Sequence, residues 1–197
     1  MCSKDLYILF DSSGSVNDYG DAGYMAVKEF VYTVMDTYYT NGATGDVSVA
    51  YYSNAVDGAI VVLALDDYSS TLDDIKANIT ASAFLGGQTD LESALNSIIS
   101  DISDSAKSTT SILVITDGQT NVGEEGDVVI DTVVEAGYNV FAVLVVPPTG
   151  YYGDERADIQ DVLGDRSVIA SSYVGIETNP DDGDVDNSDW AAMVVCS

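Results

Sequence analysis

Three short segments of this sequence concentrate side chains with oxygen donors. They read Asp11-Ser12-Ser13-Gly14-Ser15, Gly86-Gly87-Gln88-Thr89-Asp90 and Thr116-Asp117-Gly118. The donors are hard oxygens, which suit Mg²⁺, Mn²⁺ or Ca²⁺ and not a soft transition metal. The five candidate metal ligands are Asp11, Ser13, Ser15, Thr89 and Asp117. Because only two of them carry charge, a divalent ion held by this set would remain attractive to a carboxylate from a partner.

The elements that must position these segments follow from the apolar pattern. Continuous apolar runs at 6–10 and 112–115 directly precede the first and third segments and predict buried strands. Further strands are expected at 47–52, 59–63, 140–146 and 168–170. Helices are expected from an apolar stripe at 24–38, with an end near Asn41-Gly42, and at 71–79, 91–102, 127–136 and 158–163. The strands at 47–52 and 59–63 can pair as a hairpin.

This alternation of strands and helices predicts one α/β domain over residues 1–197. Its sheet is expected to be mostly parallel, with one antiparallel edge strand and helices on both faces. Ligands of such open sheets bind beyond the carboxyl ends of the strands, where the three segments fall.

Composition narrows the function classes. The chain has 33 Asp and Glu against 6 Lys and Arg, a formal net charge of -27, which repels nucleic acid. It has no His, so Ser-His and Cys-His nucleophiles are absent and we expect no enzyme. A metal-dependent phosphohydrolase is the enzymatic alternative, but the first segment lacks the second Asp of an aspartyl-phosphate enzyme. No apolar stretch approaches the roughly 20 residues that span a bilayer, so we expect no direct membrane insertion.

Together the DxSxS segment after a first strand, the Thr after paired glycines and the later TDG segment resemble the von Willebrand factor type A domain, as in integrin I domains. The resemblance covers essentially the whole chain. In that family the motif is the metal-ion-dependent adhesion site (MIDAS), and its five positions have counterparts here in Asp11, Ser13, Ser15, Thr89 and Asp117. The resemblance implies a doubly wound sheet with Mg²⁺, Mn²⁺ or Ca²⁺ bound at this motif. It also implies cation-dependent adhesion, in which a carboxylate of the ligand binds the metal ion. The family often has a second Thr where this chain has Asp90, which could favour Ca²⁺ or cap the following helix.

Several further residues are secondary candidates. Cys2 and Cys196 lie near opposite ends of the chain, and domain termini often lie close together, so a disulfide between them is expected; two reduced thiols are the alternative. Joined termini also resemble extracellular members of the family. Asn78 begins a glycosylation sequon. Asp90, Tyr151 and Tyr152 could form a ligand rim, with tyrosines packed on their own domain as the alternative. The acidic stretch 182–189 is either a second Ca²⁺ site or a solvated turn.

Two functions remain in view. The first is an extracellular or cell-surface adhesion domain, part of a larger multidomain protein, that binds a protein bearing an exposed carboxylate or an acidic glycan. The second is a structural matrix or filament subunit whose acidic surface is bridged by Ca²⁺.

Overall fold

The computed structural model describes residues 4–17, 21–40, 43–54, 56, 58–64, 72–102, 106, 109–146 and 155–170. The strands are β1 (Asp5–Asp11), β2 (Val47–Tyr52), β3 (Ala59–Leu63), β4 (Thr110–Thr116), β5 (Asn139–Val145) and β6 (Ser167–Ala170). The helices are α1 (Asp21–Thr40), α2 (Leu72–Ala81), α3 (Leu91–Ile99), α4 (Gly126–Glu135) and α5 (Glu155–Leu163). Two short 3₁₀ helices, η1 (Gly14–Asn17) and η3 (Gly164–Arg166), complete the described elements.

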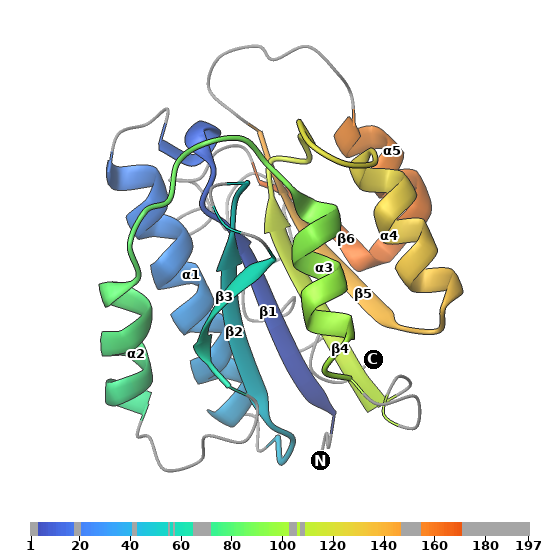
Figure 1. Ribbon diagram of the computed structural model, residues 1–197. Coiled ribbons are helices and arrows are strands. Elements are labelled where there is room, and N and C mark those ends of the chain that lie inside the picture. The colour runs from blue at the N-terminus through green and yellow to red at the C-terminus, as the bar shows by residue number, and fades with distance from the viewer. Residues whose placement is uncertain are drawn as a thin grey trace.

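The strands form one six-stranded sheet in the order β3-β2-β1-β4-β5-β6. Every neighbouring pair is parallel except β2 and β3, which are antiparallel and place β3 at the edge. Figure 1 shows β2 and β4 pointing to the same upper edge while β3 runs the opposite way. The expected doubly wound sheet with one antiparallel edge strand is therefore confirmed.

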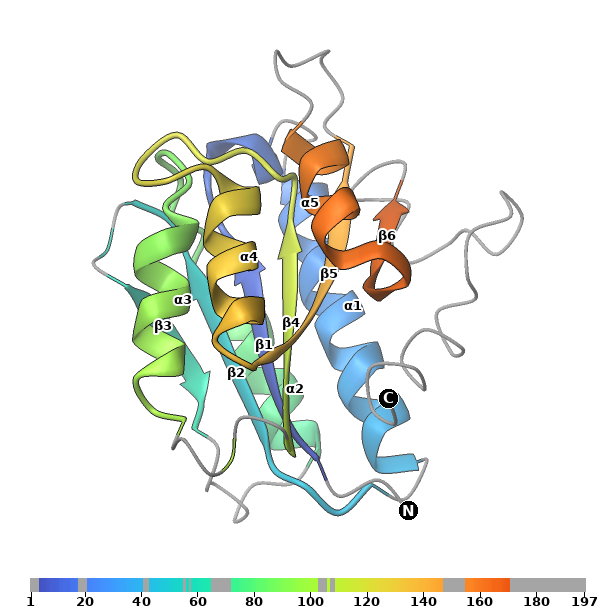
Figure 2. The ribbon, with the colours of Figure 1, turned by 90° about the vertical axis from the view of Figure 1, so that its right-hand side faces the viewer.

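Helices cover both faces of this sheet, so each central strand is buried on two sides (Figures 1 and 2). Leu6, Ile8 and Phe10 of β1 pack with α1 and α2 in one hydrophobic cluster. Tyr7 and Leu9 point the other way, into a second cluster built with α3, α4 and α5. Because successive strand residues face opposite sides, the unbroken apolar run of β1 is what a two-sided core requires.

The structure corrects the predicted end of the helix at 91–102. It ends at Ile99, three residues early, and the chain continues in a tight turn. The backbone N–H of Ile102 donates to the carbonyl of Ile99 at 3.2 Å, three residues back instead of four. Ile102 stays buried in this turn, and that is why its apolar character extended the helical pattern.

The other sequence predictions concern membrane spans and residues outside the described part of the chain. In the described part of the chain, no helix is both long and apolar enough to cross a bilayer. Cys2, Cys196, Tyr151, Tyr152 and the stretch 182–189 lie outside the described residues, so the disulfide, the tyrosine rim and the second Ca²⁺ site remain predictions.

Candidate functional site

The fold brings the three oxygen-rich segments together at the carboxyl edge of the sheet. Asp11 ends β1, Ser13 lies just before η1, and Ser15 lies within η1. Thr89 comes just before α3 and Asp117 just after β4. The segments are in contact, because the hydroxyl of Thr89 donates to Ser13 Oγ at 3.0 Å, and Ser13 Oγ lies 3.1 Å from Ser15 Oγ.

The first carboxylate of the site, Asp11, is fully buried. Its Oδ1 accepts the backbone N–H of Ser13 at 2.6 Å, and its Oδ2 accepts the hydroxyl of Thr116 at 3.4 Å. Burial and, next, the charge of Asp117 raise the pKa of Asp11 from 3.8 to about 8, although the bonds from Ser13 and Thr116 oppose the shift. Without an added cation, Asp11 therefore retains a proton near neutral pH.

The second carboxylate, Asp117, is equally buried and only half satisfied. Its Oδ1 accepts the backbone N–H of Gln119 at 3.1 Å, whereas no described residue lies in hydrogen-bond geometry with Oδ2. Burial raises the pKa of Asp117, and hydrogen bonding by Ser15 and Gln119 and the charge of Arg156 act in the opposite direction. Arg156 belongs to α5, and sequence reasoning had assigned it no role.

These donors fit a hard divalent ion. A buried carboxylate oxygen without a partner is costly, and a cation would satisfy it. The three hydroxyls of Ser13, Ser15 and Thr89 add neutral oxygens beside the two carboxylates. Among the described residues, no group of three Asp, Glu, Cys or His side chains could hold a metal. The candidate site therefore combines two carboxylates with hydroxyls and is not built from carboxylates alone.

Hydrogen bonds between distant segments fix the loops of the site. Ser12 accepts the backbone N–H of Leu85 on its hydroxyl at 3.0 Å and that of Gly86 on its carbonyl at 2.9 Å. Gly14 N–H donates to the carbonyl of Gly87 at 2.8 Å. Gly86 and Gly87 both adopt positive φ, 68° and 81°, which favours glycine and explains the paired glycines before Thr89.

Two asparagines outside the five candidate ligands brace the Thr89 loop. Asn54 exchanges hydrogen bonds with Gln88, at 2.8 Å from its N–H to the Gln88 carbonyl and 2.7 Å from the Gln88 N–H to its Oδ1. Asn121 does the same with Thr89, at 3.1 and 3.3 Å. Asn121 follows the TDG segment by three positions, and that proximity is the one sequence signal that could have found it.

An open hollow lies over these residues. It encloses about 290 Å³ and is lined by Ser13, Gly14, Ser15, Gly87, Gln88, Gln119 and Asn121. Of the five candidate ligands, Ser13 and Ser15 line this hollow.

The structure gives Asp90 a structural role at the start of α3. Its Oδ1 accepts the backbone N–H of Ser93 at 3.0 Å and caps the helix, which was one of the two expected roles. Asn78 is exposed on α2, so the sequon is accessible. Neither observation tests Asp90 as part of a ligand rim or Asn78 as a glycosylation site.

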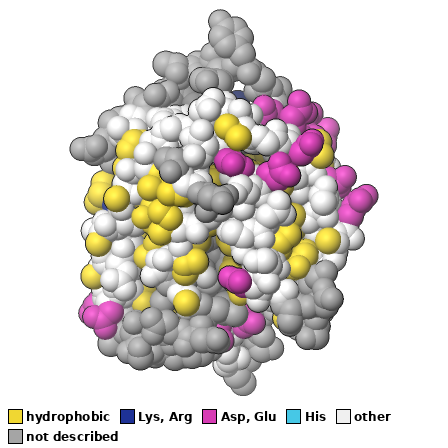
Figure 3. All heavy atoms as spheres, in the orientation of Figure 1, with side chains coloured by type: hydrophobic (Ala, Val, Ile, Leu, Met, Phe, Trp, Pro, Cys, Tyr) yellow, Lys and Arg dark blue, Asp and Glu magenta, His cyan; other side chains and the backbone are white. Residues whose placement is uncertain are grey.

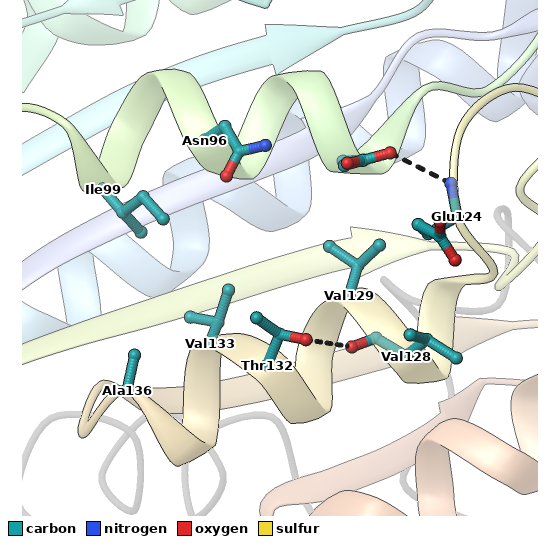
Figure 4. A pocket seen from close by; sticks show the side chains of 9 residues that line it. Asn96, Ile99, Glu124, Val128, Val129, Thr132, Val133 and Ala136 are labelled. Carbon is teal, nitrogen blue, oxygen red and sulfur yellow. Dashed lines mark hydrogen bonds between the residues drawn. The ribbon is translucent and has the colours of Figure 1, made fainter.

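A second, smaller hollow of about 130 Å³ lies between α3 and α4 (Figure 4). Ile99, Val129 and Val133 contribute apolar side chains, and Glu124 lies at one end, where its backbone N–H donates to Glu92 Oε2 at 3.0 Å. It has space for about one side chain and contains none of the five candidate ligands.

Acidic side chains are unevenly spread over the face seen in Figure 3. Asp and Glu gather over α4 and α5 at the upper right, and hydrophobic side chains gather at the left, toward β3 and α2. A partner that approaches the carboxyl edge of the sheet from the α4 side therefore meets negative charge.

Comparison with known proteins identifies the family. The model of the von Willebrand factor type A domain matches residues 5–172. The comparison with curated proteins finds no match.

Solved structures share the fold. One structure of proximal thread matrix protein 1 from the mussel byssus is 21% identical to this chain, with a TM-score of 0.71. A structure of the same protein with a zinc-occupied MIDAS motif is 20% identical, with a TM-score of 0.72. Each alignment covers 98% of this chain and 47% of the matrix protein chain. A von Willebrand factor type A protein from Catenulispora acidiphila is 18% identical, with a TM-score of 0.65 and coverage of 98% and 42%. The chain thus spans about half the length of these structures.

Proposed function

The chain belongs to the von Willebrand factor type A domain family, and from this premise we propose that it binds a partner protein through a divalent ion. The residues that would hold the ion are Asp11, Ser13, Ser15, Thr89 and Asp117. The observation that carries this proposal is Asp117 Oδ2, a buried carboxylate oxygen that finds no hydrogen-bond partner in the described part of the chain, beside the buried Asp11 and three hydroxyls.

The bound ion, Mg²⁺ or else Mn²⁺ or Ca²⁺, would supply an open coordination position that a partner carboxylate can fill. The residues of this chain supply the negative charge and hold the ligand groups in position. Asp11 and Asp117 provide charge, and the hydroxyls of Ser13 and Thr89 hold each other in place through their 3.0 Å bond. The two carboxylates balance the charge of a divalent ion without excess negative charge, and the other ligands are neutral hydroxyls, so the ion can still accept an anionic group.

The partner is proposed to be an extracellular or cell-surface protein with an exposed carboxylate, or an acidic glycan. Because the described acidic surface lies beside the site, basic groups around that carboxylate would favour docking. We propose an adhesive role within a larger multidomain protein and no enzymatic activity, since the chain has no His to act as general base. Asp90, Tyr151 and Tyr152 remain the proposed ligand rim, and Cys2 and Cys196 the proposed disulfide.

Titration calorimetry of Mg²⁺, Mn²⁺ and Ca²⁺ into chelator-treated protein tests the site. Ser13→Ala removes one proposed ligand and leaves both carboxylates, and we expect it to lose the binding. Ser100→Ala is the matched control, because its hydroxyl donates to the carbonyl of Ser97 on the exposed end of α3. Equal binding in all three proteins would place the ions on the acidic surface and refute the site.

A structural matrix role is the second candidate, and the net charge of -27 favours it. Acidic surfaces of neighbouring molecules repel one another until a divalent ion bridges or screens them. Light scattering against Ca²⁺ concentration distinguishes the roles. Bridging predicts assembly that survives Ser13→Ala and Thr89→Ala, whereas assembly lost in both variants would assign it to the metal site.

A further inference from the structure

Tyr52 is a buried tyrosine directly beside the proposed metal site. It is the last residue of β2 and pairs in register with Asp11, the last residue of β1. Its side chain is 0% exposed, and its hydroxyl is one of the buried polar atoms that find no hydrogen-bond partner among the described residues. A phenol hydroxyl is normally bonded when it is buried, so this one calls for an explanation.

The sheet directs this hydroxyl toward the ion-holding carboxylates. Tyr52 and Ala50 pack on the α3 side of the sheet, as do Leu9 of β1 and Val114 of β4. Side chains two residues apart in a strand share a face, so Asp11 lies on the same side as Leu9, and Thr116 on the same side as Val114. Tyr52, Asp11 and Thr116 thus end three neighbouring strands on one face.

The charges around Tyr52 agree with this placement. Burial raises the pKa of Tyr52 well above 10, and the charges of Asp11, Asp117 and Asp90 act in the same direction, so the phenol remains a neutral donor. The nearby hydroxyl of Thr116 opposes this shift, although no described residue lies in full hydrogen-bond geometry with the Tyr52 hydroxyl. The charge of Asp117 acts on Tyr52, and Asp117 Oδ2 is an acceptor without a hydrogen-bond donor among the described residues. An unpaired donor and an unpaired acceptor in one buried cluster are what a single bridging water would satisfy.

We propose that Tyr52 is a positioning residue of the metal site, whose hydroxyl donates through one buried water to the carboxylates of Asp11 and Asp117. The proposal rests on the proposed function, because it assigns Tyr52 the task of holding these carboxylates in place for the ion. Groups that orient metal-binding side chains contribute to affinity without touching the metal.

Two tyrosine-to-phenylalanine variants test this role. Tyr52→Phe removes only the unpartnered hydroxyl. Tyr38→Phe is the matched control: Tyr38 is also 0% exposed, but its hydroxyl donates to the carbonyl of Lys4 at 2.6 Å, far from the site at the opposite end of the sheet. Both variants are compared with the unchanged chain by thermal unfolding without metal and by calorimetric titration with Mg²⁺ and Ca²⁺.

The two variants should respond in opposite ways. Tyr52→Phe is expected to lower metal affinity about tenfold to a hundredfold and to leave the melting temperature of the metal-free protein nearly unchanged. Tyr38→Phe is expected to lower that melting temperature by about 2–4 °C and to leave metal affinity unchanged.

One result would overturn the inference: Tyr52→Phe binds Mg²⁺ and Ca²⁺ with an affinity within about twofold of the unchanged chain, while Ser13→Ala abolishes binding. Tyr52 would then only fill space, and the proposed function would stand. If Ser13→Ala also leaves binding unchanged, the proposed function itself fails, and the inference fails with it. A loss of affinity in Tyr52→Phe equal to that in Tyr38→Phe would likewise refute a specific role.

Discussion

Loading the metal site should release a proton, and the size of that release follows from the burial of Asp11. Burial and the neighbouring Asp117 raise the pKa of Asp11 to about 8 in the metal-free protein. With that pKa, the carboxyl holds about nine-tenths of a proton near pH 7 and about one-tenth near pH 9. A divalent ion that binds the carboxylate must displace this proton.

The sign of the pH dependence is fixed by the direction of the shift. Because the proton competes with the ion, apparent metal affinity should rise about tenfold per pH unit below pH 8 and level off above it. Calorimetric titration near pH 7 in buffers of different ionisation enthalpy measures the protons released as the slope of observed enthalpy. A slope near zero at pH 7, with binding intact, would refute a protonated Asp11.

Stability of the metal-free protein provides the matching control. A carboxyl whose pKa is raised on folding stabilises the folded state at low pH, and this contribution is lost as the pH rises from about 4 through about 8. Asp117→Asn removes the charge that contributes to the shift. It should therefore flatten the fall in melting temperature between pH 6 and pH 8 while it abolishes metal binding. A fall as steep as in the unchanged chain would show that Asp117 does not influence Asp11.

Three further changes test the fold and the site. Gly45→Ala should destabilise by about 3 kcal/mol or more in urea unfolding, because its Cβ would overlap the backbone carbonyl of Lys4; a loss below about 0.5 kcal/mol would contradict this contact. Lys28→Met should cost about 1–3 kcal/mol in the same assay, since the buried ammonium donates to the carbonyl of Thr80 at 2.8 Å near the end of α2; an unchanged midpoint would show that the bond contributes nothing. Thr89→Val keeps the side-chain volume and removes one proposed ligand. Calorimetry should therefore show weaker Mg²⁺ binding, while the circular dichroism spectrum stays unchanged. An unchanged Mg²⁺ affinity would show that Thr89 is not a ligand.

The strands and the positions of the site were predictable because their signals are local. The apolar run of β1 is followed at once by Asp11, and that of β4 by Asp117, so the end of each strand also locates a carboxylate. Parallel pairing then brings the two ends to one edge of the sheet. Thr89 was predictable for a similar reason, since paired glycines mark the turn before α3.

Other features had no local signal. Asn54 acts on the site only through its bonds to Gln88, 34 residues away, and such a pairing leaves no periodic pattern in the sequence. Tyr52 looked like any aromatic residue of a buried strand, because its special position depends on its register with Asp11. The tight turn after Ile99 kept its apolar residue buried without helical geometry, so periodicity overestimated α3.

The bracing of the site loops has a consequence for the kinetics of recognition. Ser12, Gly14 and Asn54 hold the segment 85–88 by hydrogen bonds to its backbone before any partner arrives. Its conformational entropy is lost when the domain folds, so docking need not order that segment. Association should then proceed without a slow rearrangement of these loops, with a rate constant that depends on diffusion and on the attraction between acidic surface and basic partner. Ionic strength, more than loop motion, would set how quickly this domain captures its ligand.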